Sequence, residues 1–143
     1  MNAAQIETRI TESFERTRPY VPVLVQRLAI TYGIPLFSAL LIATIGSRLL
    51  LALLPEFPLS TATVLILVIN LVVLVRGYAW MEQRYGGTKL FFLYNVVSRN
   101  RREIKRLMVQ SPDDTAAVNK LLQQLQMSEQ DFVGAAGAAT QSA

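Results

Sequence analysis

Two long apolar stretches dominate the pattern of hydrophobic and polar positions along the chain. The nineteen residues Leu28–Gly46 carry no charge, and after one arginine the apolar pattern continues over Leu49–Leu54. A second uncharged stretch covers Leu59–Val75. An α-helix rises about 1.5 Å per residue, so roughly 20 apolar residues cross a hydrocarbon core of about 30 Å. The pattern predicts two transmembrane helices, at about 28–54 and 59–80.

The first predicted helix fits the membrane in either of two registers. One register covers Leu28–Gly46 and the other covers Ile34–Leu54. The second register places Pro35 in the first helical turn, where its missing N–H costs no hydrogen bond. The second helix reaches the required length if it continues past Arg76, whose long side chain can extend toward the headgroups.

A short segment bounded by two prolines, Pro-Glu-Phe-Pro at residues 55–58, separates the two predicted helices. A connection this short joins antiparallel neighbours, so we expect a helical hairpin. A buried hairpin inside a soluble protein is disfavoured, because the rest of the chain holds too little apolar surface to cover it. A cleaved signal peptide is also disfavoured, since glutamates are mixed with the N-terminal arginines and no small-residue cleavage site follows.

Positive charges lie on the two outer flanks of the predicted hairpin. Since Lys and Arg flanking a membrane span mark the cytoplasmic side, we expect both termini there, or on the stromal or matrix side of an organelle. The loop side has only Arg48, which itself lies within apolar sequence. The flanking cations are Arg9, Arg16, Arg18 and Arg27 before the first span, and Arg76, Arg84, Lys89, Arg99, Arg101, Arg102, Lys105 and Arg106 after the second.

Amphipathic helices are predicted on both sides of the hairpin. Residues 4–17 place Ile6, Ile10 and Phe14 four apart, which is typical of one narrow apolar stripe. We expect Pro19 and Pro22 to break this helix from the first span. Residues 88–109 form the second amphipathic segment, after two glycines. Its apolar positions Leu90, Tyr94, Val97, Ile104 and Met108 follow a spacing of three or four, or of their sum, seven.

The C-terminal region predicts a short helical hairpin and a disordered tail. Ser111 and Pro112 have the residue types of an N-cap and a first helical position. This helix carries Val118, Leu121, Leu122 and Leu125 on one side, and Ser128 begins a second capping pattern. Residues 134–143 are small and polar, which indicates disorder.

These elements together predict an all-α integral membrane protein with a two-helix transmembrane hairpin. The expected organisation is an N-terminal amphipathic cytoplasmic segment at 1–22, the hairpin at 23–80, cytoplasmic helices at 81–133 and the tail at 134–143.

Small and polar residues within the spans are candidate sites of helix contact. Small residues four apart let helix backbones approach closely, either within the hairpin or against another subunit. The candidates are Ala39, Ala43, Gly46 and Ser47. Asn70 lies near the middle of the second span, at a level between Ser38 and Thr44. An amide in lipid requires a hydrogen-bond partner, so we expect a bond across the hairpin.

Basic residues are the candidate contacts with lipid or with a partner. Arg48 either reaches the far interface or lies within the bilayer and needs a polar partner, depending on the register of the first helix. The predicted helix at 88–109 suits anionic headgroups or a partner subunit, with nucleic acid as a third alternative that lacks a supporting motif. The predicted lipid or partner surface comprises Arg48, Arg76, Arg99, Arg101, Arg102, Lys105 and Arg106.

Composition removes most catalytic chemistry. Of the 143 residues, 52% are hydrophobic and 17% are charged, with a net charge of +4 and neither Cys nor His. Disulfides, thiolate or histidine catalysis, and zinc or haem held by these residues are therefore excluded. No phosphate-binding loop, catalytic motif or metal-ligand cluster is present in the sequence. We expect no enzyme activity, no cofactor and no metal.

The start of the first predicted span combines Arg27-Leu28-Ala29 with Gly33-Ile34-Pro35. This short segment, followed by a brief loop and a second span, resembles the two-helix assembly factors of photosystem II in thylakoids. The long basic segment at 88–109 departs from that family, so the resemblance does not assign the chain to it.

Two functional hypotheses follow from these patterns. The first is a non-enzymatic accessory or assembly subunit of a membrane complex, such as a photosynthetic or respiratory one. Its expected partners are other membrane subunits and a bilayer with anionic headgroups, without nucleic acid. The alternative is a self-assembling lipid-active protein, either a holin-like pore or a membrane-shaping scaffold, which forms homo-oligomers.

Overall fold

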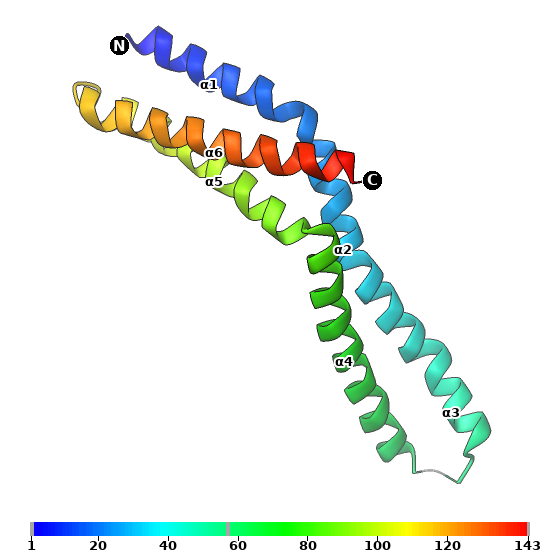
Figure 1. The fold of residues 1–143 in the computed structure, drawn as a ribbon. Coiled ribbons are helices and arrows are strands. Elements are labelled where there is room, and N and C mark those ends of the chain that lie inside the picture. Colours follow the sequence, from blue (N-terminus) through cyan, green and yellow to red (C-terminus); the bar gives the residue numbers. More distant parts are fainter. Residues whose placement is uncertain (1, 57, 143) are drawn as a thin grey trace. The chain divides into compact units, whose positions relative to one another are not determined.

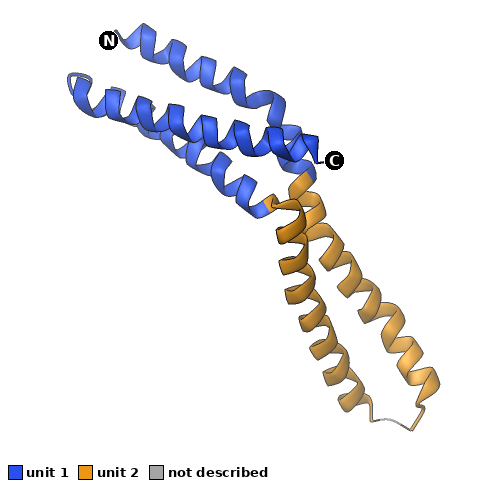
Figure 2. Ribbon diagram, viewed as in Figure 1, with its two compact units in different colours: residues 1–26, 88–143 blue, residues 27–87 orange. Residues whose placement is uncertain are grey.

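The computed structural model describes residues 2–56 and 58–142, and within these ranges every regular element is helical (Figure 1). The chain divides into two compact units (Figure 2): unit 1 is residues 1–26 and 88–143, and unit 2 is residues 27–87. The elements in chain order are α1 (Ala3–Thr17), the 3₁₀ turn η1 (Arg18–Tyr20), α2 (Val21–Leu41), the π-helical turn η2 (Ile42–Gly46), α3 (Ser47–Leu53), α4 (Leu59–Tyr85), α5 (Gly87–Gln110) and α6 (Thr115–Gln141).

Unit 2 consists of two antiparallel helical segments. The rings of Tyr32 and Tyr78 lie 5.3 Å apart, while the Arg27 guanidinium lies 5.5 Å from the ring centre of Tyr85. Residues near the start of the first segment (27–53) therefore contact residues near the end of α4. At the other end of the unit, α4 lies close to η2 and α3. The buried Ala62 of α4, 2% exposed, has the small side chain that such a close approach requires.

Two helical stretches are long and apolar enough to cross a membrane. They are the run Ala3–Leu53, which includes η1 and η2, and α4 at Leu59–Tyr85. In the most apolar part of each stretch only 6% of the residues are buried. The central helix of a soluble protein would be mostly buried, so the exposure in unit 2 separates these stretches from that class.

The sequence left two registers open for the first span, and in the structure no helix begins at Ile34, since Pro35 lies inside α2. Proline removes one backbone hydrogen bond, and the long apolar run on both sides keeps the helix intact. Pro19 and Pro22 likewise end α1 only locally: a 3₁₀ turn at Arg18–Tyr20 connects it to α2. The second apolar helix continues beyond the predicted end of the span at residue 80 to Tyr85, and it ends at Gly86, whose backbone is left-handed.

Unit 1 contains α1, α5 and α6 with an apolar interior. Its buried side chains recur every seven residues along α5 and again along α6, which is the repeat of helices that pack side by side. The ring of Tyr94 lies 5.3 Å from that of Phe132, and the Asn100 amide donates to Ser128 Oγ at 3.2 Å. These pairs make α5 and α6 antiparallel. The seven-residue series are Leu90, Val97 and Ile104, and Val118, Leu125 and Phe132.

The C-terminal region is one helix and not a short hairpin with a disordered tail. Asp114 is the N-cap, because its carboxylate accepts the Ala117 N–H, so the helix does not begin at Ser111. Ser128 does not start a new helix: its hydroxyl donates to the Leu125 carbonyl within α6. The predicted disorder at 134–143 is wrong as far as Gln141, since α6 continues to that residue and Ala136 is fully buried. Alanine is the best helix former, and a helix already nucleated extends readily through such residues.

Candidate interaction site

The predicted small-residue set lies on the first segment of unit 2 at different depths. Ala39 is buried, Gly46 and Ser47 are half-buried, and Ala43 is exposed. The π-helical turn at Ile42–Gly46 changes the number of residues per turn, so a four-residue spacing no longer follows one line on the helix. Close approach of α4 to η2 and α3 places part of this set within the chain's own helix contact.

Asn70 is the predicted polar contact in the second apolar helix. Its Oδ1 is buried and accepts no hydrogen bond from any residue that the structure describes. The Thr44 hydroxyl donates to the Leu40 carbonyl of its own helix at 2.9 Å. Thr44 therefore does not supply the bond across the unit that the sequence led us to expect.

Most of the predicted basic surface is exposed. Arg48 and Arg76 are exposed on unit 2, and Arg99, Arg102, Lys105 and Arg106 are exposed on α5 of unit 1. Arg101 is the exception, because it is only 2% exposed and cannot belong to a lipid or partner surface. Arg101 lies between Val97 and Ile104 on the buried face of α5. This position on the helix buries the side chain even though it is charged.

Arg101 joins α5 to α1 through three hydrogen bonds. Its Nε donates to Ser13 Oγ at 2.7 Å, and its Nη2 donates to the Ser13 carbonyl at 2.7 Å and to Thr17 Oγ1 at 2.6 Å. The guanidinium carbon also lies 4.1 Å from the ring centre of Phe14. Arginine suits this position because its planar group presents several donors in fixed directions.

Burial lowers the pKa of the Arg101 guanidinium, while the nearby carboxylate of Glu129 acts in the opposite direction. Nη1 of Arg101 donates no hydrogen bond to any of the described residues. Arg101 is thus a buried cation with three good hydrogen bonds, one vacant donor group and a carboxylate in its vicinity. This arrangement fixes the position of α1 and offers no reactive group.

Sequence reasoning missed the roles of Ser13 and Thr17. The signal was present, because Ile6, Ile10, Ser13 and Thr17 continue one helical stripe at a spacing of three or four. All four side chains are buried. Polar residues that continue an apolar stripe indicate a buried polar partner, since a buried hydroxyl must be hydrogen-bonded.

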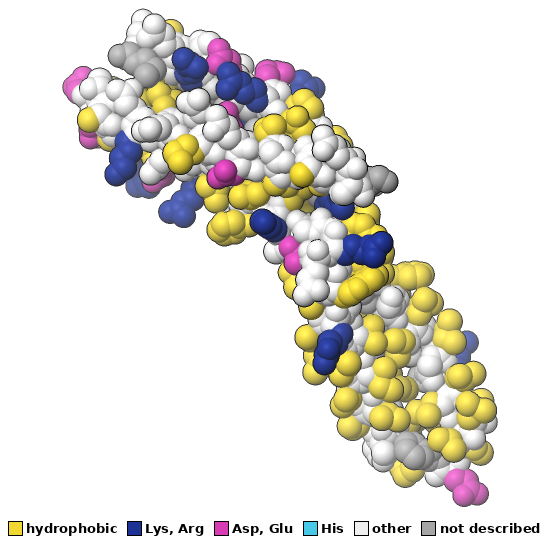
Figure 3. Space-filling model, viewed as in Figure 1, with side chains coloured by type: hydrophobic (Ala, Val, Ile, Leu, Met, Phe, Trp, Pro, Cys, Tyr) yellow, Lys and Arg dark blue, Asp and Glu magenta, His cyan; other side chains and the backbone are white. Residues whose placement is uncertain are grey.

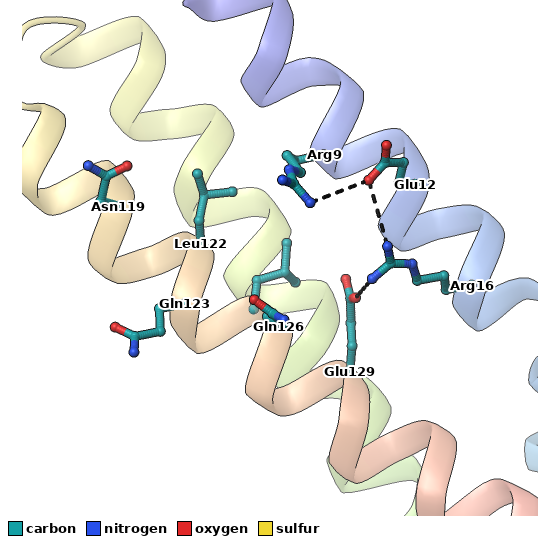
Figure 4. Close-up of a pocket in the computed structure, with 9 residues that line it drawn as sticks. Arg9, Glu12, Arg16, Asn119, Leu122, Gln123, Gln126 and Glu129 are labelled. Carbon is teal, nitrogen blue, oxygen red and sulfur yellow. Dashed lines mark ion pairs between the residues drawn. The ribbon is translucent and has the colours of Figure 1, made fainter. Parts of the chain in front are cut away.

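A shallow polar cavity of about 270 Å³ lies between α1 and α6 (Figure 4). Glu12 Oε2 lies 3.8 Å from Arg9 Nη1 and 3.8 Å from Arg16 Nη2. Nη1 of Arg16 lies 4.0 Å from Glu129 Oε2. These charges neutralise one another, and Asn119, Gln123 and Gln126 supply only amides. No group of three or more acidic side chains that could hold a metal occurs among the described residues. The charged side chains around this cavity are therefore engaged in ion pairs with one another.

Two phenylalanines of α5 are exposed and were not singled out by the sequence. Phe91 is 48% exposed and Phe92 is 66% exposed, whereas Leu90 beside them is buried. Adjacent aromatic side chains that are exposed to water carry an energetic cost. Such a pair is typical of a surface that contacts another molecule.

No protein-family model matches the chain, and neither the curated proteins nor the solved structures compared with it contain a match.

Proposed function

We propose that the chain is a two-pass integral membrane protein in which unit 2 spans the bilayer as a helical hairpin. The observation that carries this proposal is the exposure of large apolar side chains along both segments of unit 2 (Figure 3). In water each such side chain costs about 1.5–3 kcal/mol relative to burial, whereas hydrocarbon removes that cost. The exposed set includes Leu36, Phe37, Leu40, Ile45, Leu49, Leu53, Leu59, Leu67, Val68, Leu71 and Val75.

An aromatic and basic cluster at one end of unit 2 supports this placement. Tyr32 packs against Tyr78, and the arginines Arg27 and Arg84 lie over the rings of Tyr85 and Trp80, respectively, at 5.5 and 5.7 Å. Tyr and Trp favour the membrane–water interface, where one part of the side chain is apolar and the other is wet. This cluster therefore belongs at the headgroup level. With the excess of Lys and Arg in the flanks, it supports both termini on the cytoplasmic, stromal or matrix side.

We infer that the protein is a non-enzymatic accessory or assembly subunit of a larger membrane complex. Unit 1 supports this role through an apolar groove of about 600 Å³ between α1 and α5, lined by Ile10, Phe14 and Met108. Val109 at its edge is 85% exposed. Glu7 and Lys105 flank the groove with opposite charges, which suits an amphipathic helix of a partner subunit.

Cysteine labelling tests the membrane topology without background, since the chain contains no cysteine. The variants are Glu56→Cys in the connecting loop and Thr8→Cys in α1, each treated with a membrane-impermeant maleimide on intact cells. We expect Glu56→Cys to react from outside and Thr8→Cys to react only after the membrane is opened. Equal labelling of both before opening would contradict the two-pass arrangement.

Native gel electrophoresis after extraction in a mild detergent tests the subunit role. We expect one discrete complex that contains this chain together with other membrane proteins. A ladder or ring of this chain alone would overturn that role and favour the self-assembling alternative, a pore or a membrane-shaping scaffold.

A further inference from the structure

The exposed face of α5 is divided into an aromatic part and a basic part. Seven residues make almost two full helical turns, so Phe92, Arg99 and Arg106 lie along one line of the helix. Phe91 and Arg102 lie beside this line, and all five side chains are exposed. The opposite face holds the buried series Leu90, Val97, Arg101 and Ile104, which is occupied within unit 1.

The cations of this face are not neutralised within the described part of the chain. In α1 and η1, Arg9, Arg16 and Arg18 each lie within 4.0 Å of a glutamate carboxylate. No ion pair joins Arg99, Arg102, Lys105 or Arg106 to any described residue, and the only acidic residue of α5 is Glu103. Arg102 Nε reaches only the Ser98 carbonyl, at 3.4 Å. A surface with several free arginines is complementary to an external anionic surface.

The aromatic part lies near the point where the chain leaves α4. Helix α4 ends at Tyr85 and α5 begins at Gly87, so Phe91 and Phe92 follow within six residues of that start. At about 1.5 Å per residue they lie roughly 6 to 8 Å along α5 from its first residue. The chain connection therefore keeps both rings within a short distance of the end of the proposed span.

We propose that the exposed face of α5, comprising Phe91, Phe92, Arg99, Arg102 and Arg106, binds the anionic phospholipid headgroups of the bilayer that unit 2 spans. Phe91 and Phe92 enter the boundary between headgroups and acyl chains, and the three arginines contact lipid phosphates. Basic residues combined with exposed aromatics are the pattern of helices that lie in the membrane interface. A nucleic acid would match the arginines equally well, but it would not explain why the two phenylalanines lie next to the proposed span. This inference rests on the proposed membrane placement of unit 2.

A fluorescent reporter on this face tests the inference in the full chain. Asn95→Cys, on the same exposed face, carries a polarity-sensitive dye, and the protein is reconstituted in nanodiscs of phosphatidylcholine with or without phosphatidylglycerol. We expect the dye emission to shift to the blue only with phosphatidylglycerol and to return when salt is added, because salt screens exposed charges.

Removing the arginines identifies their contribution. Each cation near an anionic membrane surface contributes on the order of a fivefold gain in affinity, so Arg99→Gln, Arg102→Gln and Arg106→Gln together reduce docking roughly a hundredfold. The matched control is Arg9→Gln, Arg18→Gln and Lys120→Gln, which changes the charge of unit 1 equally at exposed positions away from this face. We expect the control to retain the shift. Loss of the shift in both triple variants would overturn the assignment of this face.

Flotation with phosphatidylcholine vesicles distinguishes failure of lipid binding by α5 from failure of the proposed membrane placement of unit 2. A chain that stays in the membrane after alkaline extraction, but whose dye ignores phosphatidylglycerol, would overturn the lipid inference and leave the membrane proposal intact. A chain that alkaline extraction releases from the vesicles would overturn both. Binding of a fluorescent single-stranded RNA that the α5 triple variant abolishes, without any lipid response, would replace lipid by nucleic acid as the ligand of this face.

Discussion

The two units place their apolar side chains in opposite ways. In unit 1, Val97, Ile104 and Phe132 are completely buried, and the charged residues other than Arg101 and Glu129 are exposed. In unit 2, leucines such as Leu67 are 62% exposed, while the buried positions include the small residues Ala39 and Ala62. Unit 1 has the distribution of a helical bundle with an apolar interior, whereas unit 2 has an apolar surface, as expected of helices whose neighbour is hydrocarbon. The same secondary structure thus carries two opposite distributions of apolar side chains, and the proposed membrane placement of unit 2 accounts for the difference.

The largest effect is expected from truncating the core of unit 1. Phe132→Ala removes a fully buried ring that packs against Tyr94, which costs about 3–5 kcal/mol. Hydrogen exchange of the full chain in detergent measures this as lost protection of α5 and α6 amides, with α4 unchanged. The control is Phe92→Ala, the same change at an exposed position of α5, for which we expect less than about 0.5 kcal/mol. Equal losses in both variants would contradict the assigned core.

A charge introduced into unit 2 tests the other half of the comparison. Leu67→Arg places an arginine at an exposed position within the central apolar part of α4 and reduces membrane insertion by about 2.5–3.5 kcal/mol, roughly a hundredfold. The integrated fraction after alkaline extraction measures it. Gln124→Arg makes a comparable change at an exposed position of α6 and should leave insertion unaltered. Normal integration of Leu67→Arg would show that this surface does not face lipid.

The buried arginine of unit 1 provides a third test. Arg101→Ala leaves Ser13 and Thr17 without their donor and opens a cavity, which costs about 3 kcal/mol and exposes α1 amides to exchange. The lowered pKa shows that burial disfavours the charged form, so Arg101→Met, which fills the space without a charge, should lose less than Arg101→Ala. The exposed neighbour offers the control: Arg102→Ala should leave α1 protection unchanged. Equal exchange of α1 amides in all three variants would contradict the contact between Arg101 and α1.

Sequence periodicity predicted the elements more completely than their contacts. The spacing of Leu90, Val97 and Ile104 predicted the buried face of α5, because a helix repeats its face every seven residues whatever the environment. Arg101 shares that face but was grouped with its neighbours by charge, and its acceptors lie more than eighty residues away in α1. Long-range partners of this kind have no local signal in a single sequence.

Local capping signals at the C-terminal end of the chain failed for a related reason. Ser128 resembles an N-cap in sequence, yet its hydroxyl bonds to Leu125 within the helix and accepts from Asn100 on α5. A tertiary contact satisfied the polar group that otherwise favours a helix end. The two long apolar stretches, by contrast, are recognised by composition over about 20 residues, which no distant contact alters.

The smallest changes in stability are expected at two glycines, one in each unit, whose backbone and surroundings differ. Gly86, which ends α4, has a φ of 60°, so Gly86→Ala forces alanine into the left-handed region and costs about 1 kcal/mol. Gly134 lies inside α6 with open space where a Cβ would be, so Gly134→Ala should stabilise unit 1 by about 0.5–1 kcal/mol. Hydrogen exchange should therefore change in opposite directions, with faster exchange at the end of α4 in the first variant and slower exchange in α6 in the second. Unprotected exchange of residues 134–141 in both the parent chain and Gly134→Ala would contradict the helix at this end of the chain.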